Sequence, residues 1–441
     1  MFKKVELWVV LLICLAFFIG TIFYGALLRH HYLLGDNYRQ LQKIAIFFAE
    51  LPANIKHKNF SNKVPEFVKN KSKPRFKRFI NTERDAILVL PRYDGNLNRS
   101  VIELIDLNNF EVIHTYKHDI NSMNDLIDTS SRNHEDVKIH SSELRFENRH
   151  PLILNDGSVL SISSNSLFKI DYCSNLEWFN QETMVHHSIN KDADNNYWIG
   201  GKLYPYSKTI SRFKKNYGFL EDSIAKISEN GELLYEKSIP EILIENKILG
   251  ERMFVETLDP IHLNDVQPAL TNTKFWKKND LFLSSRHKSA IIHYRPSTNK
   301  VINYIQGPFF LQHDVDIISD KEISIFNNNG SGSEDNEYSN VVIYNFETKT
   351  FSFKYKEGFK DNNIKTITEG LSEILKDGSM LVEEQNHGRL IFFDNKGNKE
   401  WEYVNKDDQG RVFFISWSRI IENKNLIKDI KNKANNTKCL K

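Results

Sequence analysis

The stretch DLFLSSRHKSAIIHYRPSTNKVINYI (residues 280–305) decides the fold that the sequence predicts. It begins with an apolar strand at 280–285. A hairpin follows at 290–305, in which apolar and polar residues alternate with the period of two that is typical of β-strands. Turn-forming residues separate the two hairpin strands. The stretch therefore predicts a unit of three antiparallel strands.

The same unit recurs along the chain, at intervals of about 50–65 residues. The other hairpins are VIELIDLNNFEVIHTY (101–116), SLFKIDYCSNLEWF (166–179), SIAKISENGELLYEKSI (223–239), VVIYNFETKTFSFKY (341–355) and RLIFFDNKGNKEWEY (389–403). Their preceding strands are AILVL (86–90), SVLSIS (158–163), NYWIGG (196–201), EISIF (322–326) and SMLVEE (379–384). A lone sheet of this size cannot bury both faces, but sheets stacked around an axis can.

These repeats predict an all-β domain, a six-bladed β-propeller over residues 84–421. No stretch between copies resembles a crossover helix, which argues against βαβ units. The segment RVFFISWSRII (411–421) is expected to supply a strand that closes the ring. A pair of β-sandwiches is the alternative architecture.

An apolar run, VELWVVLLICLAFFIGTIFYGALL (5–28), precedes the repeats and is long enough to cross a bilayer. Lys3 and Lys4 precede it, which favours a cytoplasmic N-terminus. Residues 1–28 are therefore predicted to be a membrane anchor, 29–83 a membrane-proximal spacer and 422–441 a C-terminal tail. A cleaved signal peptide is the competing interpretation of the apolar run.

Composition restricts the partners and the chemistry. The net charge is only +2, with acidic and basic residues well mixed, so nucleic acid is not an expected partner. Cys14 lies in the apolar run, while Cys173 and Cys439 could form a disulfide in an oxidising compartment or remain free thiols. The cysteines do not have the spacing of a zinc site.

Four short segments combine histidine or arginine with small polar residues next to predicted strands. They are VHHSIN (185–190), HLND (262–265), SSRHKSA (284–290) and QHDVD (312–316). In a propeller, the loops before the strands nearest the axis line a central funnel, and these segments belong to consecutive blades. Converging imidazoles and a guanidinium are suited to an anion that is held or transferred.

These segments resemble the bacterial arylsulfate sulfotransferase family, as do the stretches EGLSEILKDGSMLV (369–382) and GNKEWEY (397–403). The resemblance implies six blades, a periplasmic propeller on the bacterial inner membrane, and transfer of a sulfuryl group between phenols through a sulfohistidine. In the residues of this chain, it implies that His313 is the nucleophile and that His262 and Asn264 form an H-x-N pair. Arg286 would match the arginine of the S-S-R motif. His187 would match the remaining active-site histidine, with His186 as the fallback.

The chemistry of these side chains is consistent with such a role. A sulfuryl group moves through a loose transition state, as a phosphoryl group does, with charge on its equatorial oxygens. A neutral imidazole is a competent nucleophile, and a guanidinium can bind two sulfate oxygens. His262 and Asn264 could donate hydrogen bonds to those oxygens, and His187 could carry the proton of the phenol. The expected partners are a small-molecule sulfate donor and a hydroxyl acceptor, and no metal or cofactor is needed.

Two other functions stay open on sequence alone. His187, His262 and His313 could hold zinc as a three-histidine site of a hydrolase. Alternatively, the propeller could be non-catalytic and bind a partner protein or an envelope glycan.

Overall fold

The computed structural model describes residues 6–29, 41, 44–45, 47–49, 51, 75–128, 143, 146–163, 165–213, 219–254, 257–330 and 338–439. The chain divides into two compact units. One contains residues 1–61 and 208–219, and the other contains the rest of the chain. The predicted spacer, 29–83, lies largely outside the described residues, so its extent stays a prediction.

The first unit contains one long apolar helix, α1 (Leu7–Arg29), and the short helix α5 (Lys208–Ser211). Residues Leu7–Leu28 have a mean hydropathy of 2.6, and their length as a helix is about 33 Å. That length and apolarity are those of a membrane-crossing helix. An N-terminal signal sequence has the same pattern.

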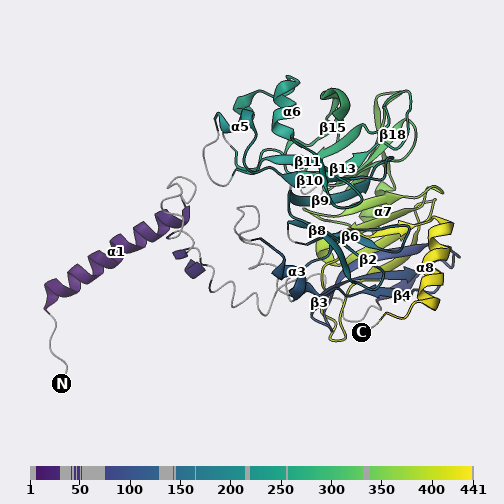
Figure 1. Ribbon diagram of the computed structural model, residues 1–441, viewed down its shortest axis with the longest axis horizontal. Helices are drawn as coiled ribbons and strands as arrows, with labels where there is room; N and C mark the ends of the chain where they lie inside the picture. Colours follow the sequence, from purple (N-terminus) through teal and green to yellow (C-terminus); the bar gives the residue numbers. More distant parts are fainter. Residues whose placement is uncertain are drawn as a thin grey trace. The chain divides into compact units, whose positions relative to one another are not determined.

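The second unit is a six-bladed β-propeller (Figure 1). Blade one contains β25 (Arg419–Ile421), β2 (Ile87–Asp94), β3 (Arg99–Asp106) and β4 (Glu111–Tyr116). Blade two contains β5 (Arg149–Ile153), β6 (Val159–Ser163), β7 (Ser166–Ile170) and β8 (Leu176–Asn180). Blade three contains β9 (Met184–Lys191), β10 (Tyr197–Lys202), β11 (Asp222–Ile227) and β12 (Leu233–Ser238).

The remaining blades follow the same order. Blade four contains β13 (Leu263–Pro268), β14 (Leu281–Ser285), β15 (Ala290–Arg295) and β16 (Lys300–Ile305). Blade five contains β17 (Val315–Ile317), β18 (Glu322–Asn327), β19 (Asn340–Asn345) and β20 (Thr350–Lys354). Blade six contains β21 (Leu371–Ile374), β22 (Met380–Glu384), β23 (Arg389–Phe393), β24 (Lys399–Val404) and an outer fifth strand, β1 (Phe76–Arg78). The helices α3 (Ile120–Asp125), α6 (Ile239–Glu245) and α7 (Lys356–Asp361) lie in connections.

Alternation along the strands explains how the blades pack on each other. In β2, Ile87 and Val89 belong to a buried cluster shared with blade two. Leu88 and Leu90 belong to a cluster shared with blade six. Successive side chains of a strand point to opposite faces, so one apolar strand can contact both neighbouring sheets. The continuous apolar runs of the repeat are therefore strands that are buried on both sides.

The C-terminal segment closes the ring. β25 pairs with β2, so the last strand of the chain completes the first blade. Of the predicted closing strand 411–421, only residues 419–421 form β25. After it, α8 (Lys424–Asn436, yellow in Figure 1) packs on β4 and buries Ile427 and Ile430. Cys439 then forms a disulfide with Cys173 in blade two, which answers the question that the cysteine spacing left open.

The strand nearest the axis differs from the sequence interpretation. The predicted inner strands 196–201, 280–285 and 322–326 are the second strands β10, β14 and β18. The innermost strands are β9, β13 and β17, and these lie in or beside the segments VHHSIN, HLND and QHDVD, which the sequence analysis placed before the inner strands. The functional motifs therefore belong to the axial strands and their entries.

Candidate active site

Six imidazoles from blades two to five form a connected group, here called the axial histidine cluster. Its members are His150, His186, His187, His262, His287 and His313. The ring centroid of His187 lies 5.7 Å from that of His150, 5.9 Å from that of His262 and 6.0 Å from that of His313. His186 lies 4.0 Å from His187, and His287 lies 4.7 Å from His262. The predicted convergence of the histidine motifs is thus present in the fold.

A bulge in β9 places two neighbouring histidines on one side of the strand. Consecutive residues of a regular strand point to opposite faces. Here the pairing of β9 with β10 is irregular between Ile199 and Gly201, and His187 has a φ of 62°, in the left-handed region. A bulge of this kind re-aims side chains. It requires Gly200, because a Cβ there would lie 2.6 Å from the carbonyl oxygen of His186.

Three of the histidines occupy the same place in their blades. Leu152, Ile189 and Val315 each pair with the second strand of the blade, opposite Leu160, Ile199 and Ile325. The residues two positions earlier are His150, His187 and His313. This equivalence distinguishes His187 from its neighbour His186. It also identifies His150, which the sequence analysis missed although HPL (150–152) repeats the pattern of HSI (187–189) and HDV (313–315).

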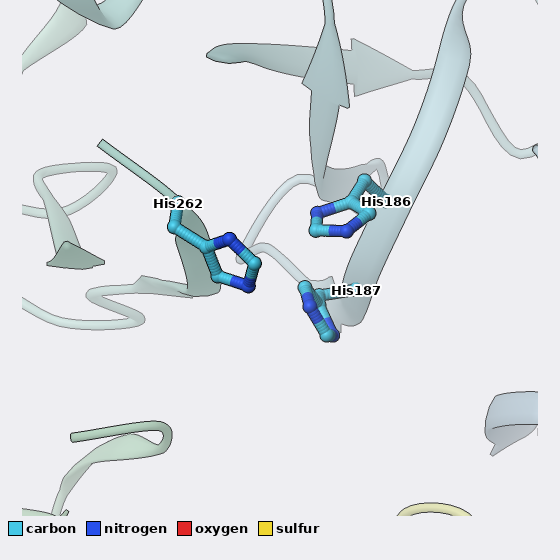
Figure 2. Close-up of side chains that lie close together, drawn as sticks. All are labelled: His186, His187 and His262. Atoms are coloured by element: carbon cyan, nitrogen blue, oxygen red, sulfur yellow. The ribbon is translucent and has the colours of Figure 1, made fainter. Parts of the chain in front are cut away.

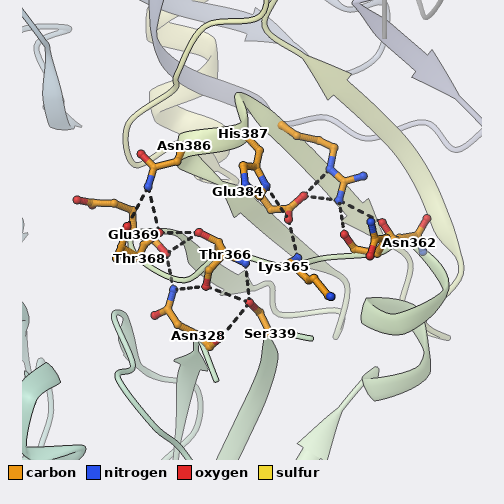
Figure 3. A network of polar contacts seen from close by, with 12 residues as sticks. Asn328, Ser339, Asn362, Lys365, Thr366, Thr368, Glu369, Glu384, Asn386 and His387 are labelled. Atoms are coloured by element: carbon orange, nitrogen blue, oxygen red, sulfur yellow. Dashed lines mark hydrogen bonds and ion pairs between the residues drawn. The ribbon is translucent and has the colours of Figure 1, made fainter. Parts of the chain in front are cut away.

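His313 is fully buried and its tautomer is fixed by Asn328. The Asn328 Nδ2 group donates to the carbonyl oxygens of Thr366 (2.9 Å) and Glu369 (2.7 Å), so its Oδ1 is left to accept (Figure 3). His313 Nδ1 lies 2.8 Å from that oxygen and must carry the proton. Nε2 therefore holds the lone pair, and the backbone N–H of Glu369 donates to it at 3.0 Å. Burial lowers the pKa of His313 to about 3, so the ring is neutral at physiological pH.

His262 is oriented by a carboxylate. Its Nδ1 lies 2.6 Å from Asp259 Oδ2, while Nε2 has no hydrogen bond among the described residues. His287 Nδ1 donates to the backbone oxygen of Asp259 at 2.7 Å. Arg286 Nη1 donates to His287 Nε2 at 2.9 Å. The four residues thus form one continuous group on the rim of blade four.

Arg286 has an unused hydrogen-bonding edge. Within the part of the chain that the structure describes, Arg286 forms no ion pair, and its Nε is buried without a partner. Its charge helps to lower the pKa of His313. Burial lowers the pKa of Arg286 itself, but not enough for a guanidinium to lose its proton. A guanidinium that keeps its proton and has an unpaired N–H can bind an anion.

Asn264 lies beneath the cluster rather than within it. Its side chain is fully buried, and Nδ2 donates to the backbone oxygen of Gln312 at 3.1 Å. Gln312 immediately precedes His313, and its own amide nitrogen donates to the backbone of Ser285 and Ala290. Asn264 therefore contacts the backbone that carries His313.

Glu369 is the second residue that the sequence analysis did not single out. Burial raises the pKa of its carboxyl group, while the charges of Arg149, His262 and Arg286 act in the opposite direction. Its φ of 64° turns the backbone N–H towards His313. The role of a backbone N–H has no signature in residue type, although Glu369-Gly370 opens the stretch that resembles the family.

Burial also keeps three other imidazoles of the cluster neutral. It lowers the pKa of His150, His186 and His187 well below the ordinary value, and neighbouring positive groups lower it further. Neutral imidazoles offer lone pairs or N–H donors, but they are weak bases.

Further along the axis, buried carboxyl groups surround one arginine. Asp265, Asp314, Asp316 and Glu373 come from blades four to six, and the charge of Arg419 acts on all of them. Arg419 donates to the backbone oxygen of Ile189 at 2.6 Å. Burial raises the pKa of Asp316 to about 8 and that of Glu373 to about 7. These groups hold protons that an unfolded chain would release near pH 4.

One protein-family model matches this chain. The family model described as arylsulfotransferase (ASST) matches residues 150–406, from His150 to blade six. No curated protein matches the chain.

Three of the solved structures that match the chain are distantly similar to it. A Bacteroides caccae protein of unknown function has 11% identity and a TM-score of 0.48, with coverage of 77% of this chain and 100% of its own. A streptogramin B lyase has 9% identity and a TM-score of 0.39, with coverage of 78% and 97%. Virginiamycin B lyase from Staphylococcus aureus has 10% identity and a TM-score of 0.38, with coverage of 74% and 87%.

The family match covers more than half of the chain and includes every histidine of the axial cluster. With the six-bladed fold and its axial histidines, it shows that this chain belongs to the arylsulfotransferase family.

Proposed function

We propose that the chain transfers a sulfuryl group from an aryl sulfate ester to a phenolic or other hydroxyl acceptor through a sulfohistidine at His313. One observation carries the proposal: His187, His262 and His313 meet from three consecutive blades, with the ring of His187 about 6 Å from each of the other two. Membership of the arylsulfotransferase family supports sulfuryl chemistry at this place.

In the first step, the lone pair on His313 Nε2 attacks the sulfur of the donor. The N–S bond forms while the S–O bond to the aryl group breaks, and the phenolate leaves with the electron pair. The tautomer that Asn328 fixes supports this role, because it keeps the proton on Nδ1 and the lone pair on Nε2. In the second step, the acceptor oxygen attacks the sulfur, the N–S bond breaks, and the acceptor hydroxyl releases its proton.

The backbone N–H of Glu369 covers the nucleophile in the free protein. For the attack, this donor must leave Nε2, and it could then donate to an oxygen of the sulfuryl group. The transition state carries its charge on those oxygens, so a donor that moves from the lone pair to an oxygen favours transfer. Arg286 supplies the positive charge for the same oxygens.

His262 is a better candidate than His187 to donate a proton to the departing oxygen and to take one from the attacking oxygen. Asp259 lies 2.6 Å from Nδ1 and would stabilise an imidazolium, as the carboxylate does in a histidine–aspartate pair. His187 has a strongly lowered pKa and lacks a carboxylate partner among the described residues. We therefore assign His187 to hydrogen bonding with the sulfuryl group, His186 to substrate contact, and Asn264 to holding the backbone of His313.

The propeller is proposed to lie outside the cytoplasm, held by α1 as a single-pass anchor. A disulfide between Cys173 and Cys439 supports an oxidising compartment. The apolar length of α1 supports a membrane span. On this proposal the propeller occupies residues 84–421, with the spacer at 29–83 and the tail at 422–441.

The two alternative functions receive less support. A zinc site that uses His313 is disfavoured, because both ring nitrogens of His313 already have hydrogen-bond partners. A non-catalytic binding module would give no role to the imidazole and guanidinium groups that converge at the axis. No feature of the described residues favours binding alone over sulfuryl transfer.

The test uses the full chain, a chromogenic aryl sulfate and a phenol acceptor. His313→Asn should abolish release of the chromogenic phenol, whereas His387→Asn in blade six should retain it. Mass spectrometry of wild type treated with donor alone should reveal an adduct of about 80 Da on the peptide that contains residues 312–316. Equal activity of the two variants, or an adduct on another histidine, would reject His313 as the nucleophile.

A further inference from the structure

Three imidazoles of the axial histidine cluster also have the arrangement of a metal site (Figure 2). His186, His187 and His262 each offer one ring nitrogen, and the three atoms lie within 4.8 Å of one another. Tetrahedral zinc with three histidine ligands needs nitrogen atoms about 3.3 Å apart. Small rotations of the side chains would close this difference.

The backbone of β9 is irregular at His186 and His187. Neighbouring His186 and His187 have ring centroids 4.0 Å apart, which a regular strand would prevent. The irregular pairing of β9, the positive φ of His187 and the glycine at position 200 together make it possible. Left-handed conformations of non-glycine residues are disfavoured and tend to occur at functional sites.

The hydrogen bonds leave the required atoms available. His186 Nδ1 is buried and has no hydrogen-bond partner among the described residues. His262 Nδ1 is held by Asp259 at 2.6 Å, which leaves Nε2 for a ligand. A carboxylate on the far nitrogen is the usual support of a metal-bound histidine. No described residue forms a hydrogen bond with the imidazole of His187, which lies within β9.

A neighbouring group, Asp259, His262 and His287, has similar distances but is closed. His262 Nδ1 is already bound to Asp259, and both ring nitrogens of His287 have partners, the Asp259 backbone oxygen and Arg286. An ion there would have to displace these bonds and approach the Arg286 guanidinium.

We propose that His186, His187 and His262 bind Zn²⁺ or another nitrogen-preferring divalent transition metal, with a fourth position open to solvent or to an anionic ligand. Lys202 and Arg149 contribute positive charge near His186, whereas Asp259 and Glu369 contribute negative charge near His262. Because these positive and negative charges oppose each other, we expect moderate affinity for the metal ion. Because His187 and His262 also belong to the proposed sulfuryl site, bound metal should compete with the sulfate donor. This last consequence rests on the proposed function.

The experiment measures Zn²⁺ binding to the purified full chain by competition with a chromophoric chelator, and Co²⁺ coordination by visible absorption. Wild type should bind one ion with the spectrum of tetrahedral Co²⁺. His186→Ala and His262→Ala should each weaken Zn²⁺ binding by about 100-fold, and Asp259→Asn by about 10-fold or more. His287→Ala is the matched control and should retain the affinity of wild type.

Three results would overturn the site. They are wild-type binding no tighter than that of His186→Ala, octahedral Co²⁺, and loss of affinity in His287→Ala but not in His186→Ala. Transfer activity is measured separately in the presence of a chelator. Activity without metal and its inhibition by Zn²⁺ would support both proposals. Activity that requires Zn²⁺ would overturn the metal-free sulfuryl transfer while leaving the metal site intact.

Discussion

At the scale of single residues, the state of His313 depends on Asn328. The Asn328 side chain accepts from His313 and donates to two carbonyl oxygens of the segment 366–369, so one amide fixes both the proposed nucleophile and the group that covers it. None of these three contacts involves a charged group. Activation of the proposed nucleophile is therefore a matter of tautomer and position, not of a raised pKa.

Replacement of Asn328 should lower the rate of the proposed reaction while the protein still folds. In Asn328→Ala, Nδ1 of His313 loses its acceptor, and the tautomer with the proton on Nε2 becomes accessible. We expect the rate of phenol release from an aryl sulfate to fall by about 100-fold, in the range typical of positioned proton-transfer groups. Asn175→Ala, in an exposed turn of blade two, is the control. An unchanged rate in Asn328→Ala would contradict the role of the tautomer.

Gly200 is the residue that permits the bulge of β9. In Gly200→Ala, the new methyl group would lie 2.6 Å from the His186 backbone oxygen and 3.1 Å from Leu263, so β9 must shift. We expect loss of transfer activity together with a lower melting temperature, because overpacking of this kind costs about 1–3 kcal/mol. Gly250→Ala should affect neither, since no atom lies within 4 Å of a Cβ there. Full activity in Gly200→Ala would show that the bulge is dispensable.

Residue types predicted which groups converge in the candidate site, but not their contacts. His187, His262, Arg286 and His313 were proposed because imidazole and guanidinium groups beside strands are rare and chemically distinctive. Glu369 could not, because it acts on His313 through its backbone. Asn264 was predicted to contact sulfate, which stays a prediction, and its amide nitrogen donates to the backbone of Gln312, a contact that only the fold creates.

At the scale of the element, the innermost strands were the hardest to predict. β9 contains histidine, serine and asparagine, and β17 has only three residues, so neither has the apolar alternation that identified the outer hairpins. Their position at the axis depends on packing between blades rather than on local propensity. The outer three strands of each blade were predictable because they are buried on both faces and separated by turn residues.

The inner strands also carry the buried carboxyl groups, which predicts a dependence of stability on pH. Burial raises the pKa of Asp316 to about 8, and the charges of Asp265 and Glu373 act in the same direction. The folded protein thus keeps protons that the unfolded chain loses near pH 4. This contribution to stability is complete below pH 4 and is lost as the pH rises towards 8.

Thermal unfolding between pH 5 and pH 8 checks this prediction. The melting temperature of wild type should decrease over this interval, and Asp316→Asn should decrease less, because an amide cannot release a proton. The exposed Asp361→Asn is the control and should follow wild type. An equal decrease in Asp316→Asn and wild type would exclude Asp316 as a source of the pH dependence.

At the scale of the whole molecule, the seam between blades one and two depends on a covalent link. Cys173 and Cys439 are separated by 266 positions, and their disulfide ties the end of α8 to blade two. Cross-links that close long loops typically contribute about 2–4 kcal/mol to stability. The seam is thus held by β25, by the apolar side chains of α8 and by this bond.

Loss of the disulfide should lower stability without changing the site. In Cys439→Ser, we expect the free energy of unfolding to decrease by about 2–4 kcal/mol and the melting temperature to fall accordingly. Cys14→Ser should match wild type, and a reducing agent should affect wild type but not Cys439→Ser. Equal melting temperatures for the two variants would show that the bond contributes nothing measurable.

The pairing of β25 with β2 has a consequence for biogenesis. Ribosomes deliver β2 (Ile87–Asp94) long before β25 (Arg419–Ile421), so the opening blade waits for its final partner while the other five blades are made. During that interval a vacant backbone edge invites mismatched strands. Premature termination before Arg419 would leave it permanently unpaired. Quality-control proteases should therefore discriminate sharply against products that stop before β25.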